Sequence, residues 1–368
     1  MRRWLWSGLL VVSIGLSPAG GSASDGPERR APLTFDELTV QPKVRDVLLS
    51  PTGDRLAALL DESYGASLWT LDLPAGAPRK ICDTRRVERL HWSTDGTRLF
   101  LETSERLGVV SVEIGSSERS RPAWIVELDG EREQAFAEVD PVLPRHLLIT
   151  ETSADGEGRL VRVDEHGTAT TVFESASPIT DYLLDAVGEV QFFKGIDEDT
   201  QVIERVVDRD DAERRVILRC PVLDPCGLVA FDGDRVLMRS RRDGERFDHD
   251  RWRLVAVDPD TGVALPVHGD PEELVDLGRL VLGSTDRQPL MVGYETDRLR
   301  FYGLDSATER HLRGLRERFA DRRIAVQAED TGSFWVLRES GPRLHHPRFH
   351  LYDTRDRSVR EVLAEQRR

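Results

Sequence analysis

Three arginines form the densest cluster of basic side chains in the central part of the sequence. Arg239, Arg241 and Arg242 lie close together, separated by Ser240. Guanidinium groups bind carboxylates through paired, charge-assisted hydrogen bonds, so this cluster is a candidate site for the carboxylate of a bound peptide. The alternative is that the arginines form ion pairs with the many acidic residues nearby. The sequence leaves both interpretations open.

Three short segments contain residue types that bind cations. His345 and His346 precede a proline, residues 248–250 read Asp-His-Asp, and residues 197–199 read Asp-Glu-Asp. Adjacent side chains of an extended loop point apart, and a metal site needs further ligands at fixed spacing. We find no such spacing, and no Walker, dinucleotide-binding or zinc-finger motif, in the sequence. We therefore predict no metal and no cofactor.

The sequence contains three cysteines. Cys220 and Cys226 lie close together around Pro221 and Pro225, a turn-like context that suits a local disulfide in an exported protein. The alternative is that both are small apolar residues at strand ends. Cys82 has no histidine near it in the sequence, so we expect a buried thiol rather than a nucleophile.

A repeated turn between two strands organises the chain that carries these residues. Residues 49–57 read Leu-Ser-Pro-Thr-Gly-Asp-Arg-Leu-Ala, and residues 92–100 read Trp-Ser-Thr-Asp-Gly-Thr-Arg-Leu-Phe. In both, glycine supplies the backbone conformation that a tight turn between strands requires. Weaker copies of the pattern occupy residues 144–150, 185–193, 231–238, 284–292 and 329–337. Alternating apolar and polar residues downstream predict a third and a fourth strand in each repeat.

Seven copies at this period predict an all-β protein, a seven-bladed β-propeller of four-stranded antiparallel blades. One blade cannot cover both of its faces, whereas blades stacked around a centre bury them between neighbours. A β-sandwich, the other all-β candidate, needs fewer repeats. Within the sixth repeat, residues 308–320 carry Leu312, Leu315 and Phe319 at helical spacing, which predicts a short inserted helix.

The first residues have the order of a secretory signal peptide. Arg2 and Arg3 precede an apolar run, and small residues follow it. The run is short for a membrane span, although an uncleaved anchor is the alternative. We predict a signal peptide over residues 1–24, a lead-in segment over 25–40 and the propeller over 41–368. The expected location is the periplasm or the extracellular space.

The net charge of the sequence indicates which classes of partner it can bind. The sequence has 51 lysines and arginines against 66 aspartates and glutamates, a net charge of −15. An acidic protein of this kind disfavours nucleic acid as a partner. No stretch after the expected signal peptide is apolar for long enough to span a bilayer, so we predict no membrane span after cleavage.

The two clear turns carry a resemblance to known propellers. Residues 49–57 and 92–100 resemble the L-S-P-D-G-x-x-L-A repeat of TolB-type periplasmic propellers and of prolyl-oligopeptidase-family serine peptidases. Residues 33–38 are similar to the opening of the exported peptidases, and residues 302–337 to their last two blades. The resemblance covers nearly all of the expected mature chain. It implies the non-catalytic propeller half of such a peptidase.

In that family the propeller limits which substrates reach an α/β-hydrolase domain. That domain carries its nucleophile on a G-x-S-x-G turn, followed by an aspartate and a histidine. This sequence contains no G-x-S-x-G, and it ends at Arg368, directly after the last expected strand. We therefore assign no catalytic residue and expect no enzyme activity from the chain alone.

Three functional hypotheses follow from the resemblance. The first is a propeller that binds or gates peptides or a partner protein. The second is one half of a split serine peptidase, whose catalytic hydrolase domain is a separately encoded chain. The third is a TolB-like scaffold of the cell envelope. The opening and closing segments favour peptidase ancestry.

Overall fold

The computed structural model describes residues 43–362 with short gaps. The gaps are residues 63–64, 85–86, 104–105, 112–121, 130, 209–212, 224–225, 243, 245–248, 284–286, 330–332, 342–343 and 345. The chain divides into two units, Met1–Gln41 and Pro42–Arg368, and the fold below belongs to the second. The predicted signal peptide and lead-in segment lie outside the described residues.

The repeated turn forms because a buried serine at its start satisfies the backbone at its end. The Ser50 hydroxyl accepts a hydrogen bond from Arg55 N at 3.0 Å, and the Ser93 hydroxyl accepts one from Arg98 N at 2.9 Å. Both serines are fully buried. Gly96 adopts a φ of 68°, a conformation that costs little only for glycine. The two clear sequence repeats are therefore two copies of one local structure.

Aspartate replaces serine in the third and fourth repeats. The Asp185 carboxylate accepts a hydrogen bond from Glu189 N at 3.0 Å, closing the turn of the fourth repeat. The Asp140 carboxylate accepts one from Leu143 N at 2.8 Å in the third repeat, where the sequence pattern is weakest. Asp140 is fully buried, so its side chain is part of the turn rather than a surface charge.

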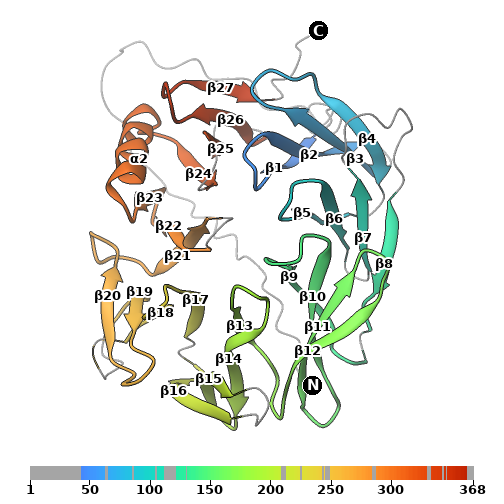
Figure 1. Cartoon of the computed structure of the whole chain (residues 1–368). Coiled ribbons are helices and arrows are strands. Elements are labelled where there is room, and N and C mark those ends of the chain that lie inside the picture. Colours follow the sequence, from blue (N-terminus) through green and yellow to red (C-terminus); the bar gives the residue numbers. More distant parts are fainter. Residues whose placement is uncertain are drawn as a thin grey trace, which may run out of the picture. The chain divides into compact units, whose positions relative to one another are not determined.

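The strands of the described residues form seven antiparallel sheets around a common centre, which Figure 1 shows from one end. Blade 1 consists of β1 (Lys43–Leu49), β2 (Arg55–Glu62), β3 (Gly65–Asp72) and β4 (Arg79–Thr84). Blade 2 consists of β5 (Arg89–Trp92), β6 (Arg98–Glu102), β7 (Arg106–Ser111) and β8 (Ala123–Glu127). Blade 3 consists of β9 (Ala135–Val139), β10 (His146–Thr152), β11 (Gly158–Asp164) and β12 (Ala169–Ser175).

The remaining blades continue in chain order, so the fold is the predicted seven-bladed propeller. Blade 4 consists of β13 (Asp181–Leu184), β14 (Val190–Asp197), β15 (Thr200–Asp208) and β16 (Glu213–Pro221). Blade 5 consists of β17 (Gly227–Phe231), β18 (Val236–Ser240), β19 (Arg253–Val257) and β20 (Ala264–His268). Blade 6 consists of β21 (Leu277–Leu282), β22 (Pro289–Glu295) and β23 (Leu299–Gly303). Blade 7 consists of β24 (Arg323–Ala328), β25 (Phe334–Ser340), β26 (Arg348–Asp353) and β27 (Val359–Val362).

Blade 6 corrects the prediction of a fourth strand in every repeat. Its sheet has three described strands, and helix α2 (Ser306–Arg318) follows the third. The Asp305 side chain caps the helix by accepting hydrogen bonds from Ala307 N and Thr308 N. Leu312 and Leu315 are buried, as their helical spacing predicts. The inserted helix is therefore confirmed, and it stands in place of the outer strand.

The core consists of seven apolar clusters among the described residues, each between two neighbouring blades. Strand β6 shows how one strand serves two of them. Leu99 and Leu101 belong to the cluster shared with blade 1, whereas Phe100 belongs to the cluster shared with blade 3. Successive side chains of a strand point to opposite faces, so an apolar run suits a blade packed on both sides.

No strand crosses between the first and last blades among the described residues. Blade 1 uses β1 to β4 and blade 7 uses β24 to β27, each in consecutive order. Side-chain packing closes the ring instead: Leu49 of blade 1 and Val336 of blade 7 lie in one apolar cluster. The Gln327 side chain also accepts a hydrogen bond from Leu49 N at 3.2 Å. Among the described residues, these contacts join the first blade to the last.

Two further expectations concern single features. Cys82 is free and only 4% exposed, and burial raises the pKa of its thiol to about 11, so the expected buried thiol is confirmed. Within the described ranges, no helix combines the length and apolar character needed to cross a bilayer.

Candidate functional site

A cavity of about 460 Å³ lies where the inner strands of blades 3 to 6 face one another. We call it the channel cavity. Strands β9, β13, β17 and β21 line it, and Figure 1 shows all four at the centre of the ring. Its apolar walls include Phe136, Ile179, Leu228 and Leu280. Its polar lining includes Glu138, Asp181, Tyr182 and Arg287.

An ion pair joins blade 6 to blade 3 at this cavity. Arg287, in the turn that follows β21, places Nη1 at 2.8 Å from Oε2 of Glu138 on β9. The Arg287 side chain is 41% exposed and that of Glu138 is 25% exposed, so a ligand in the cavity can reach both groups. Arg287 also adopts a φ of 55°, the left-handed region that costs a side-chain-bearing residue about 1–2 kcal/mol.

The Tyr182 hydroxyl is buried at the wall of the channel cavity, beside the Glu138–Arg287 ion pair. Burial raises the pKa of this hydroxyl, and the neighbouring Glu138 carboxylate raises it further, so the group stays protonated. Tyr182 therefore adds a neutral polar group to the buried side of this ion pair.

A buried lysine fixes the wall between blades 4 and 5. Lys194 Nζ donates a hydrogen bond to Cys226 O at 2.9 Å and lies 3.7 Å from Oδ2 of Asp181. The same Asp181 oxygen accepts a hydrogen bond from Leu228 N at 2.8 Å. Burial raises the pKa of Asp181, and the nearby Lys194 charge opposes the rise without cancelling it. Three polar contacts thus hold the start of β17 against β13.

A disulfide joins Cys220 to Cys226 in the structure, the pairing that the turn-like context suggested. Cys220 lies near the end of β16, the outer strand of blade 4, and Cys226 directly precedes β17, the inner strand of blade 5. Both half-cystines are buried in the cluster between these two blades. The disulfide therefore ties the start of one cavity-lining strand to the preceding blade.

The three arginines of the sequence-based prediction have separate partners. The Arg239 guanidinium lies 4.3 Å from the centre of the Trp252 ring, a cation–π contact. Arg241 Nε donates a hydrogen bond to His249 O at 2.9 Å, and Arg242 Nε donates one to Gly244 O at 3.2 Å. These contacts hold the three side chains against described residues between β18 and β19. None of the three lines the channel cavity, and their role in peptide binding stays a prediction.

The candidate cation segments have other contacts where they are described. Glu198 adopts a φ of 52° in a hairpin turn, and Asp197 pairs with Arg219 at 3.2 Å. His249 Nδ1 accepts a hydrogen bond from Arg251 N at 3.2 Å. Asp248 and His345 lie outside the described residues. Within the described ranges, no group of three or more histidine, cysteine or acidic side chains is arranged to hold a metal ion.

Glu138, Asp181, Tyr182 and Arg287 were not among the residues predicted from the sequence. They lie in three separate stretches of sequence, and only the closed ring brings them together. The inner strand of each repeat offers one sequence signal. It lies next to the centre of the ring, so a polar residue on it is a candidate for a central site. Aligning the seven inner strands would have marked polar residues at centre-facing positions as candidates. The cavity offers a ligand apolar walls and an accessible ion pair.

No protein-family model and no curated protein matches the sequence. Solved structures do match by fold. A prolyl endopeptidase aligns at 11% identity with a TM-score of 0.55, over 89% of this chain and 50% of its own. The β-propeller domain of the Trilobed protease from Pyrococcus furiosus, described as having an open velcro topology, aligns at 12% identity with a TM-score of 0.52. The alignment covers 89% of this chain and 97% of that domain.

A third solved structure, the acylaminoacyl peptidase from Pyrococcus horikoshii, aligns at 12% identity with a TM-score of 0.52, over 89% of this chain and 53% of its own. The chain thus spans about half the length of the two whole peptidases. At these identities the likeness concerns the fold. The chain has the fold of the β-propeller domains found in prolyl-oligopeptidase-type peptidases.

Proposed function

We propose that this chain is a propeller module that binds an extended peptide in the channel cavity and does not itself catalyse a reaction. One observation carries the proposal: the channel cavity joins apolar walls from several blades with the partly exposed Glu138–Arg287 ion pair. A peptide backbone carries a hydrogen-bond donor and an acceptor at nearly every residue, so it can contact this pair in many registers. The apolar walls around Ile179 and Leu280 would receive its side chains.

The ion pair at the cavity supports the same function. Glu138 and Arg287 are neutralised by one another, yet both remain partly exposed. A peptide carries hydrogen-bond donors and acceptors side by side, and a carboxylate next to a guanidinium can contact both kinds of group. The pair would therefore orient a peptide backbone rather than select one sign of charge.

The comparisons support this proposal through the fold alone. The three structures described above are two peptidases and the propeller domain of a third. If the channel cavity has the role proposed here, it acts as a filter or holding site for peptides that another domain processes.

A second candidate is that the propeller docks onto a separately encoded serine peptidase domain. The observation that favours it is the coverage of the whole peptidases, half of the prolyl endopeptidase and 53% of the acylaminoacyl peptidase. A fluorophosphonate probe tests it. Labelling of a co-purifying chain supports this candidate, and labelling of the propeller chain itself contradicts the non-catalytic proposal. No observation on the described residues favours the third hypothesis, a TolB-like scaffold.

The channel cavity is tested by filling it. Fluorescence anisotropy measures the affinity of the full chain for a mixed pool of fluorescein-labelled octapeptides without stable structure. Leu280→Trp adds bulk to the cavity wall, and we expect affinity to fall at least about tenfold, or 1.4 kcal/mol. Leu265→Trp is the matched control, because Leu265 is 47% exposed on the outer strand β20. Equal affinities of the two variants and the parent would contradict the proposal.

The same assay tests the arginine cluster of the sequence prediction. Arg241→Ala and Arg242→Ala remove side chains that lie in the segment between β18 and β19, outside the cavity lining. A fall in affinity in these variants would extend the peptide site to this segment. Unchanged affinity would confine the site to the inner strands.

A further inference from the structure

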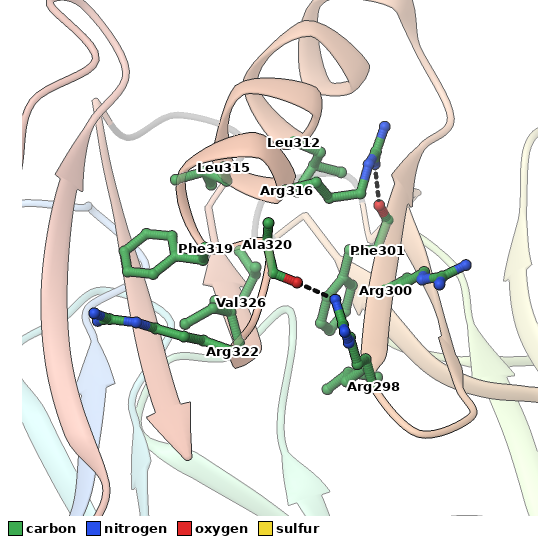
Figure 2. A pocket seen from close by; sticks show the side chains of 12 residues that line it. Arg298, Arg300, Phe301, Leu312, Leu315, Arg316, Phe319, Ala320, Arg322 and Val326 are labelled. Atoms are coloured by element: carbon green, nitrogen blue, oxygen red, sulfur yellow. Dashed lines mark hydrogen bonds between the residues drawn. The ribbon is translucent and has the colours of Figure 1, made fainter. Parts of the chain in front are cut away.

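A second cavity, of about 230 Å³, lies between β23, helix α2 and β24. We call it the helix pocket. It belongs to the junction of blades 6 and 7, and Figure 1 shows α2 on the outer side of the ring. Figure 2 shows the residues that line it from close by, on the strand, on the helix and on the chain that follows the helix. It shares no lining residue with the channel cavity.

The helix pocket exists because a helix occupies the position of a strand. Flat sheets of neighbouring blades pack closely face to face, whereas a cylinder laid against a sheet leaves a gap along its side. The apolar lining side chains other than Ala320 belong to one core cluster and are nearly inaccessible: Phe301 is 5% exposed, Leu312 2% and Phe319 7%. Protein interiors seldom leave voids larger than a water molecule among such residues. An apolar cavity of this size is therefore suited to an apolar guest.

The charged residues that line the pocket are all arginines. Four of its twelve lining residues are arginines, Arg298, Arg300, Arg316 and Arg322, and the other eight are apolar. Three of these arginines have carboxylate partners that do not line the pocket. Those pairs are Arg300 with Glu272, Arg316 with Glu309, and Arg322 with Glu339.

Of the four lining arginines, Arg298 has the most distant carboxylate partners. Its nearest carboxylate contacts are 3.6 Å to Asp297 and 3.8 Å to Asp321, and both acids are largely exposed to solvent. Its Nη1 donates a hydrogen bond to Ala320 O, directly after α2, as the dashed line in Figure 2 marks. The Arg298 side chain is 42% exposed, so its remaining N–H groups can reach a ligand at the pocket entrance.

We propose that the helix pocket binds a small aliphatic carboxylic acid, with its tail against Phe301 and Leu312 and its carboxylate on Arg298. The apolar lining accounts for the tail, and the guanidinium at the entrance accounts for the anionic head. The pocket is smaller than the roughly 300–1,000 Å³ of sites for drug-sized ligands, so it takes one short chain rather than a lipid with several. The inference does not depend on the peptide function proposed for the channel cavity.

Isothermal titration calorimetry on the full chain tests the proposal with three probes that share one tail. Sodium octanoate has the proposed head, 1-octanol has a neutral head and octylammonium has the opposite charge. We expect octanoate to bind most tightly and octylammonium least tightly. Arg298→Ala should weaken octanoate binding about tenfold, the loss of a hydrogen bond to a charged group, and leave 1-octanol unchanged. Equal binding of octanoate and octylammonium would overturn the assignment of the anionic head.

Filling the pocket tests the position of the tail. Val326→Phe adds a ring to the lining strand β24, and it should abolish binding of both octanoate and 1-octanol. Val326→Met is the milder variant if the larger ring lowers the melting temperature, and it should weaken both ligands in the same proportion. Arg313→Ala, on the exposed side of α2, is the control and should change neither. Octanoate binding that survives both Val326 variants, or no binding to the parent chain, would refute the site.

Discussion

The two cavities of this propeller differ in the signs of their charges and in how their walls are held. The channel cavity carries carboxylates and a guanidinium, paired across the ring through Glu138 and Arg287. The helix pocket carries guanidinium groups and no carboxylate in its lining. The wall of the channel cavity is fixed by a disulfide and a buried lysine, whereas the helix pocket is walled by a helix laid on a strand.

This difference follows from where each cavity lies in the repeat. Inner strands of different blades meet at the centre, so a charged residue on one blade can form an ion pair with a residue of opposite charge on another. The helix pocket lies at a single junction, and its arginines take their carboxylate partners from residues outside the lining. A cavity with both charges suits a ligand with donors and acceptors, and a cavity with one charge suits an ion of the other sign.

Replacing the buried lysine should give the largest effect and should act on the channel cavity alone. Lys194→Met leaves Asp181 without its cation and Cys226 O without a donor. We expect a loss of about 2 kcal/mol in the free energy of unfolding. This is below the 3–5 kcal/mol of a fully buried pair because the Asp181 side chain is 30% exposed. Urea unfolding measures the stability, and octanoate binding to the helix pocket should not change.

A second lysine provides the control for this variant. Lys80 pairs with Glu62 and Asp83 at the surface, so Lys80→Met should cost well under about 1 kcal/mol. Adding Asp181→Asn to Lys194→Met should recover part of the lost stability, since no carboxylate is then left without its cation. Equal losses in the two single variants would show that Lys194 does not hold the cavity wall.

Arg287 separates backbone strain from ligand binding. Arg287→Ala and Arg287→Gly both remove the ion pair with Glu138, so both should weaken peptide binding equally. Only glycine relieves the φ of 55°, and we expect the glycine variant to be more stable by about 1 kcal/mol. Thermal and urea unfolding measure this difference. An alanine variant as stable as the glycine variant would contradict the strained backbone.

The smallest expected effect concerns pH at the helix pocket. Burial raises the pKa of Glu309, but hydrogen bonds from Arg316 and from Gly303 N outweigh it and hold the pKa below its usual value. The stability that this carboxylate contributes is complete above the unfolded-state pKa near 4.5 and is lost as pH falls through the lower folded-state pKa. The loss should be a fraction of about 1 kcal/mol, because the side chain is partly exposed.

Melting temperatures measured between neutral and acidic pH test the direction of this change in stability. Glu309→Gln should destabilise the protein at neutral pH and approach the parent as the pH falls. Asp181→Asn is the matched comparison at the channel cavity, where burial makes the folded-state pKa higher than the unfolded one. Protonation of Asp181 therefore stabilises the native state as pH falls, opposite to Glu309. If protonation of both residues changed the stability of the native state in the same direction, this contrast would be contradicted.

The local parts of the fold could be predicted from the sequence. The turns at residues 49–57 and 92–100 were recognisable because serine and glycine close them through contacts within a few residues. The helix was recognisable from Leu312 and Leu315. Its replacement of the fourth strand was not, because that outcome depends on how β23 and blade 7 pack around it. Ring closure depends in the same way on contacts between the two ends of the propeller.

The candidate site could not be predicted, because its residues become neighbours only in the closed ring. Arg239, Arg241 and Arg242 attracted attention by being close in sequence, yet each has a different partner in space. Glu138 and Arg287 are far apart in sequence and form an ion pair. Proximity in sequence is a good guide to turns and a poor guide to sites in a propeller, where the centre gathers residues from many repeats.

The most direct test of the channel cavity is to find where a bound peptide lies. An octapeptide pool that carries a photoreactive benzoylphenylalanine is cross-linked to the full chain, and mass spectrometry identifies the attached residues. We predict attachment to β13, β17 or β21, and its loss in Leu280→Trp but not in Leu265→Trp. Attachment to outer strands or to α2, or attachment unaffected by Leu280→Trp, would contradict peptide binding at the centre of the ring.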